Sequence, residues 1–111
     1  MLPRSQRLSG EQLNLVMEKG RVTHSPFFWL RLLKVEGSTR LAVVAPQKIV
    51  KTSVARHKIR RQMYDSMQGF FSLLPSGLSI VVCAKGSVME AKSEDFGKEM
   101  KEIFVKSGLL K

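Results

Sequence analysis

The sequence predicts a single-domain α+β fold, an α/β sandwich in which helices pack on a small mixed sheet, over residues 1–111. Three observations support this fold class. A chain of 111 residues that is 43% hydrophobic has enough apolar surface for one core. Its apolar residues recur with the helical period in some segments and with strand patterns in others, in the order α-β-β-(β)-α-β-α. No internal repeat or low-complexity linker divides it.

The first predicted helix ends near Lys19. Ser9 can cap its start, and Gln12, three residues later, can complete a capping box. Gly20 suits the left-handed conformation that often ends a helix. One face of this helix carries three apolar side chains, Leu13, Val16 and Met17.

Two strands are predicted next, over residues 27–33, which are rich in aromatic side chains, and over residues 41–45. A short turn at 36–38 separates them, so we expect the two strands to form an antiparallel hairpin. Pro46 ends the second strand. A short extended piece at 48–50 can add a third strand.

The longest helix is predicted from Ser53 to Leu74, because apolar side chains there fall on one stripe of helical period. The stripe consists of Ile59, Met63, Met67, Phe70 and Leu74. A break at 75–77 follows, and the apolar run at 78–84 is typical of a strand covered by helices.

A last helix is predicted to end before Gly108. Its inward face carries Phe96, Met100, Ile103 and Phe104. Its start is marked by a cap and by favourable negative charge, from Ser93, Glu94 and Asp95.

The net charge of +10, from 19 Lys and Arg against 9 Asp and Glu, makes nucleic acid the leading class of partner. We expect no membrane partner, since the longest apolar run, Leu78–Ala84, is too short to span a bilayer. Residues 1–4 lack the apolar core of a signal peptide, so a cytoplasmic location is expected. The single cysteine, Cys83, is expected to be a buried small hydrophobe.

A cluster of cations that no acid offsets is the main functional feature of the sequence. Between residues 48 and 61 it comprises Lys48, Lys51, Arg56, Lys58, Arg60 and Arg61, together with His57. On the predicted helix these side chains occupy the arc that the apolar stripe leaves free. Arginine forks, mobile lysine charges and a helix N-terminus all suit phosphate groups. The pattern favours a phosphate-binding face, with an ordinary solvated helix surface as the alternative.

The segment 54–61, Val-Ala-Arg-His-Lys-Ile-Arg-Arg, resembles the signature helix of the bacterial ribonuclease P protein family. That signature is Arg-Asn-Arg, an aliphatic residue and two basic residues. Arg56, Lys58, Arg60 and Arg61 match its basic positions, while His57 stands where the family usually has Asn. The resemblance extends along nearly the whole chain, through Arg7, Lys19, Gly20, Phe28 and Arg40.

This resemblance implies the protein subunit of ribonuclease P, an endoribonuclease of tRNA 5′ maturation. In that family the RNA subunit cleaves with bound Mg²⁺, and the protein alone is not expected to cleave. The implied partners are the catalytic ribonuclease P RNA and precursor tRNA, with no obligate protein partner. The family fold also includes a left-handed β-α-β crossover, against the general rule of handedness.

The resemblance also assigns roles to residues. The helix from Arg56 to Arg61, with Lys48 and Lys51, would contact the catalytic RNA. The 5′ leader would lie in a cleft between the first helix and the sheet, lined by Leu13, Met17, Phe28 and Arg31. Strand alternation, however, puts Phe28 on one face of the sheet and Trp29 and Arg31 on the other, so not all of them can line one cleft.

Other functions stay open at this stage. A basic ribosomal-type RNA-binding protein would share the charge and the layout. A DNA-binding protein would need a helix-turn-helix pair or a dimer seam, which the strands before the long helix do not favour. A protein nuclease would need clustered carboxylates or a histidine base, whereas the nine acids are scattered and His24 and His57 lack ligand spacing.

Overall fold

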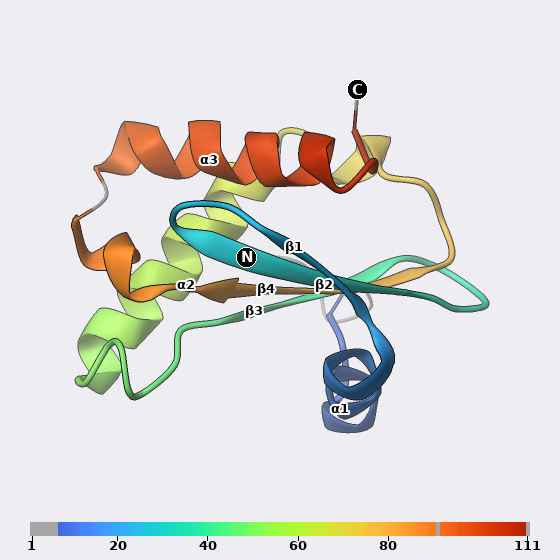
Figure 1. Cartoon of the computed structure of the whole chain (residues 1–111), viewed down its shortest axis with the longest axis horizontal. Helices are drawn as coiled ribbons and strands as arrows, with labels where there is room; N and C mark the ends of the chain where they lie inside the picture. The colour runs from blue at the N-terminus through green and yellow to red at the C-terminus, as the bar shows by residue number, and fades with distance from the viewer. Residues whose placement is uncertain (1–6, 91, 111) are drawn as a thin grey trace.

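A four-stranded mixed sheet lies at the centre of the fold (Figure 1). The computed structural model describes residues 7–90 and 92–110. In chain order the strands are β1 (Arg21–His24), β2 (Phe28–Lys34), β3 (Arg40–Val44) and β4 (Leu78–Ala84). Their order across the sheet is β1-β2-β4-β3, and β4 pairs antiparallel with β2 and parallel with β3. The predicted α+β class is confirmed.

Helices lie on both faces of this sheet. They are α1 (Gly10–Lys19), α2 (Ser53–Met67) and α3 (Ser93–Lys106). α2 and α3 pack against each other on one face, and α1 lies on the opposite face against β2 and β4 (Figure 1). Two short 3₁₀ turns, η2 (Phe71–Leu73) and η3 (Gly86–Glu90), precede and follow β4.

The main core lies between the sheet and the layer of α2 and α3. Alternation along β2 directs Phe28, Leu30 and Leu32 into this core. Phe28 meets Phe96 of α3 edge to face, with ring centroids 5.7 Å apart. Every residue of β4 is buried, because this strand has a neighbour on each side and helices pack on both faces of the sheet.

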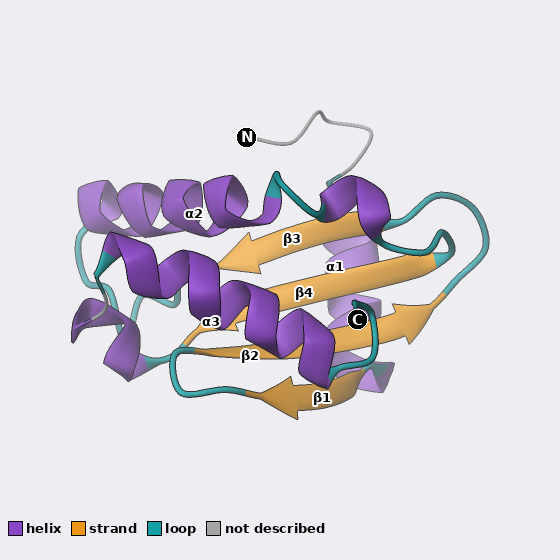
Figure 2. Cartoon of the chain, turned by 90° about the horizontal axis from the view of Figure 1, so that it is seen from above, coloured by secondary structure: helices purple, strands orange, loops and turns teal. Residues whose placement is uncertain are grey.

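The connection from β3 through α2 to β4 has an unusual hand. β3 and β4 are adjacent and parallel, and α2 lies on the viewer's side of the sheet in Figure 2. The path from one strand to the other is a left-handed crossover in this view. Nearly all such connections are right-handed. The left-handed crossover that the family resemblance implies is therefore confirmed.

Local signals in the sequence predicted the helices well. The capping box of α1 forms as expected, with the Gln12 backbone N–H donating to Ser9 Oγ at 3.3 Å and the Ser9 N–H donating to Gln12 Oε1 at 2.9 Å. Of the predicted stripe, Ile59, Met63, Met67 and Phe70 are buried and Leu74 is partly buried. The inward residues of α3 are buried as predicted. α3 ends at Lys106, and Gly108 adopts a positive φ of 88° just after it.

Predictions about strand pairing were partly wrong. The expected hairpin between residues 27–33 and 41–45 does not form, because β4 inserts between β2 and β3. Residues 48–50 form a turn rather than a strand. The additional strand is instead β1, which was not predicted and which pairs antiparallel with β2.

One helix boundary and one cap differ from the prediction. α2 ends at Met67, and the chain up to Leu74 continues through the turn η2 rather than as helix. Gly20 is not left-handed; its φ is −73°. The start of α3 is capped through Asp95, whose carboxylate accepts from the Lys92 backbone N–H at 3.0 Å. The side chain of Ser93 lies outside the described part of the structure. Residues 1–4, on which the expectation of no signal peptide rests, also lie outside it.

Candidate nucleic-acid interface

The loop before α2 is held against the first turn of that helix by Arg56. The Arg56 Nη1 donates to the carbonyl oxygens of Val50, at 3.0 Å, and Lys51, at 3.2 Å. Thr52 caps the helix by accepting from the Ala55 backbone N–H at 3.2 Å. Because of these bonds Arg56 is half-buried and partly structural, while the loop that carries Lys51 is fixed relative to the helix.

The other basic side chains of this region are exposed and form what we call the α2 basic surface. It consists of Lys48, Lys51, His57, Lys58, Arg60 and Arg61. The burial of Ile59 and Met63 sets the rotation of α2, so the intervening basic side chains point away from the core. No acid lies between Glu36 and Asp65 in the sequence, and the first turn of α2 contains none.

Two members of this surface interact directly. The guanidinium of Arg61 lies 3.0 Å from His57 Nε2, one helical turn earlier. For Arg61 to donate this hydrogen bond, Nε2 must be the unprotonated ring nitrogen. His57 therefore orients the guanidinium of Arg61 on the exposed side of α2.

The opposite face of the sheet carries a second polar surface beside α1. Alternation along β2 places Trp29 and Arg31 there, both half-buried. The Cζ of Arg31 lies 5.3 Å from the centre of the Trp29 ring, which is the range of a cation–π interaction. Arg31 Nη1 also donates to the Met17 carbonyl at 3.0 Å, so this side chain ties the end of α1 to the sheet.

The residues expected to line a cleft at α1 are only partly brought together. Met17 is 39% exposed beside Arg31, and Leu13 is half-buried on the same helix. Phe28 is wrong as a cleft residue, because it is fully buried in the core on the other face of the sheet. Trp29, and not Phe28, lies beside Arg31. The alternation of the strand already placed Trp29 with Arg31 and apart from Phe28.

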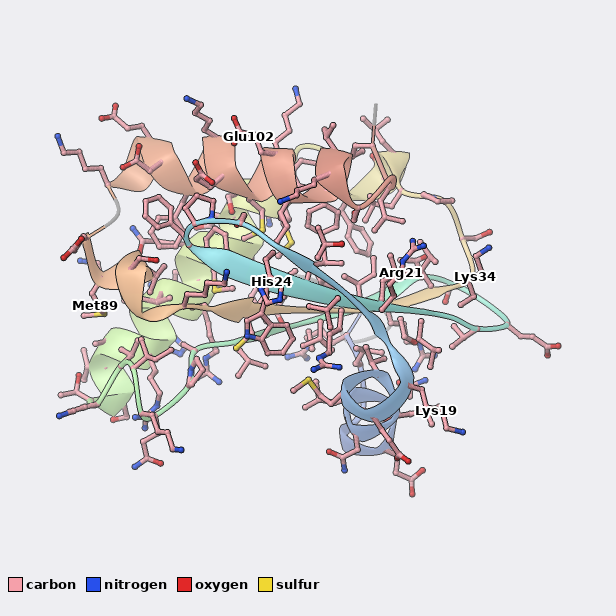
Figure 3. All side chains as sticks on the ribbon, in the orientation of Figure 1. Lys19, Arg21, His24, Lys34, Met89 and Glu102 are labelled. Carbon is pink, nitrogen blue, oxygen red and sulfur yellow. The ribbon has the colours of Figure 1, made fainter. Side chains whose placement is uncertain are left out.

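One further cation lies at the end of α1. Figure 3 shows Lys19 projecting from the end of α1, and the side chain is exposed. At the far end of β1, the His24 carbonyl accepts from Lys106 Nζ at 2.9 Å, which links this edge strand to α3.

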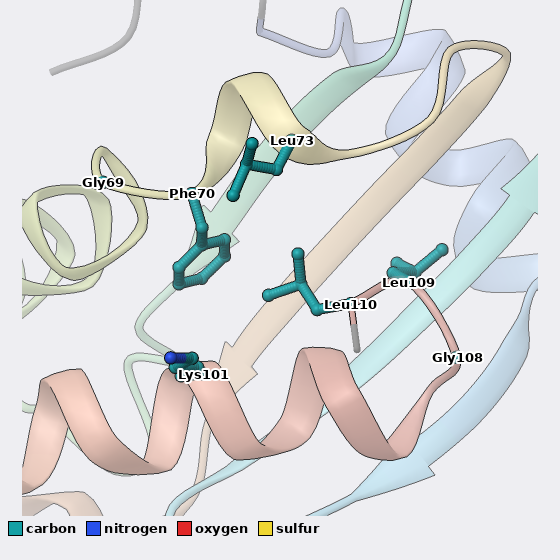
Figure 4. Close-up of a pocket in the computed structure, with 7 residues that line it drawn as sticks. All are labelled: Gly69, Phe70, Leu73, Lys101, Gly108, Leu109 and Leu110. Carbon is teal, nitrogen blue, oxygen red and sulfur yellow. The ribbon is translucent and has the colours of Figure 1, made fainter.

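Apart from these two surfaces, a hollow of about 660 Å³ lies between η2 and the C-terminal residues (Figure 4). It is lined by Gly69, Phe70, Leu73, Lys101, Gly108, Leu109 and Leu110. Lys101 is the one charged side chain of this lining, and the remaining walls are apolar or backbone. The hollow therefore differs in chemistry from the two polar surfaces.

Within residues 7–90 and 92–110, no group of three or more His, Cys, Asp or Glu side chains is placed to hold a metal ion. None of the helices described is long and apolar enough to cross a membrane. Cys83 is buried in β4, and this burial raises the pKa of its thiol from 9.0 to about 11.

Comparison with known proteins gives one consistent result. A family model described as Ribonuclease P matches residues 2–108. The "Ribonuclease P protein component" of Rippkaea orientalis is 26% identical, over 98% of this chain and 91% of that protein. The protein of the same description from Aliivibrio fischeri is 32% identical, over 87% and 83%. A solved structure of a Staphylococcus aureus RNase P protein mutant has a TM-score of 0.87 at 14% identity, covering 96% of this chain and 92% of that one.

Proposed function

The chain belongs to the ribonuclease P protein family, and we propose that it is the protein subunit that binds both the catalytic RNA and the 5′ leader of precursor tRNA. In this proposal the RNA subunit removes the leader in a magnesium-dependent reaction, and the protein alone does not cleave. The family membership decides against the ribosomal-type alternative. The cytoplasm is the proposed location.

The α2 basic surface is the observation that carries the proposal. Its cations are exposed, and they lie on a helix whose other side is anchored in the core by Ile59 and Met63. A rigid row of cations that no neighbouring acid neutralises suits the closely spaced phosphates of a folded RNA. If about five or six phosphates are contacted, the slope of log affinity against log salt should be on the order of −4 to −5.

The surface beside α1 supports the second half of the proposal. Single-stranded RNA is commonly bound by stacking of its bases on aromatic rings and arginine planes. Trp29 and Arg31 offer one such ring and one such plane side by side, with Met17 at the margin. We therefore assign leader binding to Trp29, Arg31 and Met17, with Leu13 in support from α1.

Magnesium is assigned mainly to the RNA subunit. The described residues of this chain do not form a ligand cluster that fits a metal ion. The contribution of the protein is then electrostatic and positional: it neutralises phosphates and holds the leader in place.

Reconstitution tests the proposal. The full chain is added to a cognate catalytic RNA at low magnesium concentration, with precursor tRNA as the substrate, and the rate of leader removal is measured. We expect cleavage to increase strongly with the protein present, and we expect the protein alone to release no product. An unchanged rate at every magnesium concentration would contradict the proposed function.

A further inference from the structure

A hollow of about 670 Å³ lies at the β3 edge of the sheet, apart from the α2 basic surface and the cleft at α1. We call it the β3-edge pocket. It is lined by Arg7, Leu8, Ser9, Arg40, Leu41, Ala42 and Tyr64. Two of these residues are arginines and none is acidic, so the pocket has a net positive charge.

Arg7 is held in the pocket by its backbone. The segment before α1 runs beside β3, with an isolated parallel bridge between Arg7 and Leu41 and the Leu8 N–H donating to the Leu41 carbonyl at 3.1 Å. The Arg7 Nε is buried and has no hydrogen-bond partner among the described residues. The terminal Nη atoms of the guanidinium are therefore the ones left to contact a ligand in the pocket.

Arg40 contributes the second guanidinium from β3 itself. The one polar contact of its side chain within the described residues is long: Nη1 lies 3.5 Å from Gln12 Oε1. That oxygen already accepts the capping hydrogen bond of α1 at 2.9 Å. The Arg40 fork therefore remains available for a stronger acceptor.

The third polar group comes from α2. Tyr64 lines the pocket although it is only 8% exposed, because most of its ring packs in the core. Arg60 precedes it by one helical turn on the same side of α2 and is exposed. Arg60 therefore brings the α2 basic surface near the pocket without lining it, and the contact of Arg40 with Gln12 links the pocket to α1 on the other face of the sheet.

We propose that the β3-edge pocket binds a phosphodiester phosphate of RNA between Arg7 and Arg40. Guanidinium forks bind phosphate oxygens through paired charge-assisted hydrogen bonds, and Arg7 and Arg40 bring two of them to one pocket. An RNA strand bound here would pass around the open edge of β3. This inference rests on the proposed function and adds a third contact to it.

The test compares two charge-matched double variants of the full chain. R7Q/R40Q removes both charges of the pocket. R21Q/K34Q removes two charges elsewhere, from exposed positions on β1 and at the end of β2. Affinity for the cognate catalytic RNA is measured over a series of salt concentrations. Affinity of the holoenzyme is measured for precursor tRNA with and without its leader.

We expect R7Q/R40Q to lose about tenfold in affinity and to reduce the salt slope by about 1, which corresponds to one phosphate contact. R21Q/K34Q should keep the slope of the unmodified chain. Loss in the catalytic RNA assay assigns the phosphate to that RNA, and loss only with leader-bearing substrate assigns it to the leader. R7K/R40K, which keeps both charges, should keep the slope.

Equal behaviour of R7Q/R40Q and R21Q/K34Q in all assays would overturn the inference. Should R7Q/R40Q fail to fold, the single variant R7Q is measured in the same assays. R7Q breaks no hydrogen bond of the Arg7 Nε within the described residues, so it should fold. R60E/R61E is measured in parallel. If R60E/R61E loses affinity while the pocket variants do not, only this inference fails; if neither loses affinity, the proposed function fails as well.

Discussion

The guanidinium of Arg31 lies over the indole of Trp29, with 5.3 Å between Cζ and the ring centre, while its Nη1 donates to the Met17 carbonyl at 3.0 Å. These contacts hold the arginine plane in a fixed orientation beside α1. In the proposed leader contact this side chain would therefore need little reordering, which would reduce the entropy lost on binding.

Arg31→Ala is expected to weaken binding of leader-bearing precursor tRNA about tenfold, since one stacking contact contributes about 1–3 kcal/mol. Binding of the same tRNA without a leader should change little. The measurement is the affinity of the reconstituted holoenzyme for both substrates, with Arg21→Ala on β1 as the control. An equal loss for both substrates would show that Arg31 acts only by anchoring α1.

Charge reversal on α2 is expected to prevent assembly with the catalytic RNA. R60E/R61E changes the net charge by four units at the centre of the α2 basic surface, so we expect a loss of at least about a hundredfold in affinity. K98E/K101E makes the same change of net charge on exposed positions of α3 and should have a much smaller effect. Similar losses in the two variants would mean that only the total charge matters.

Gly20→Ala is expected to lower the free energy of unfolding by about 1–3 kcal/mol. A Cβ at this position would lie 2.5 Å from the Val16 carbonyl oxygen and 3.1 Å from Val16 Cγ1. The matched control is Gly97→Ala in α3, where a Cβ meets nothing within 4 Å and helix propensity favours alanine by about 1 kcal/mol. Urea denaturation of both variants measures the difference, and a neutral Gly20→Ala would contradict the close packing of α1.

The Cys83 thiol is expected to react slowly in the folded protein. Burial raises its pKa from 9.0 to about 11, so the thiolate fraction at pH 8 falls about a hundredfold. The rate with a disulfide reagent should therefore rise at least that much in denaturant. Because the folded pKa is the higher one, the stability from this group is intact below pH 9 and is lost as the pH rises through 11. Cys83→Ala should lack that alkaline loss, and equal reactivity of folded and unfolded chains would contradict the burial.

Features that depend on neighbours along the chain could be predicted from the sequence. The capping box of Ser9 and Gln12 and the stripe from Ile59 to Phe70 each involve residues within a few helical turns. The exposed cations of α2 follow from the same stripe, because a helix with one buried side must expose the other. The fold class followed from these elements and their order.

Features that depend on distant segments could not be predicted in this way. Nothing near β3 in the sequence indicates that its partner is β4 rather than β2, since the length of turn 36–38 alone favours a hairpin. β1 was missed because Arg21–His24 is short, polar and largely exposed. The β3-edge pocket could not be predicted because it depends on distant segments: its two arginines meet only when the segment before α1 lies along β3.

The site residues divide in the same manner. Strand alternation predicts that Phe28 and Arg31 lie on opposite faces of the sheet, as they do, whereas the family layout groups them in one cleft. Arg56 matches a basic position of the signature, yet its guanidinium also donates hydrogen bonds to the carbonyls of Val50 and Lys51 and so holds the loop before α2.

The central position of β4 has a consequence for synthesis on the ribosome. β2 and β3 are made early, but each pairs with a strand that is completed only at Ala84. Until then the nascent chain can form the β1–β2 hairpin and isolated helices, with its apolar side chains still in contact with water. The synthesis of β4 thus decides when the sheet can form, and products truncated before Ala84 should remain unfolded and prone to degradation.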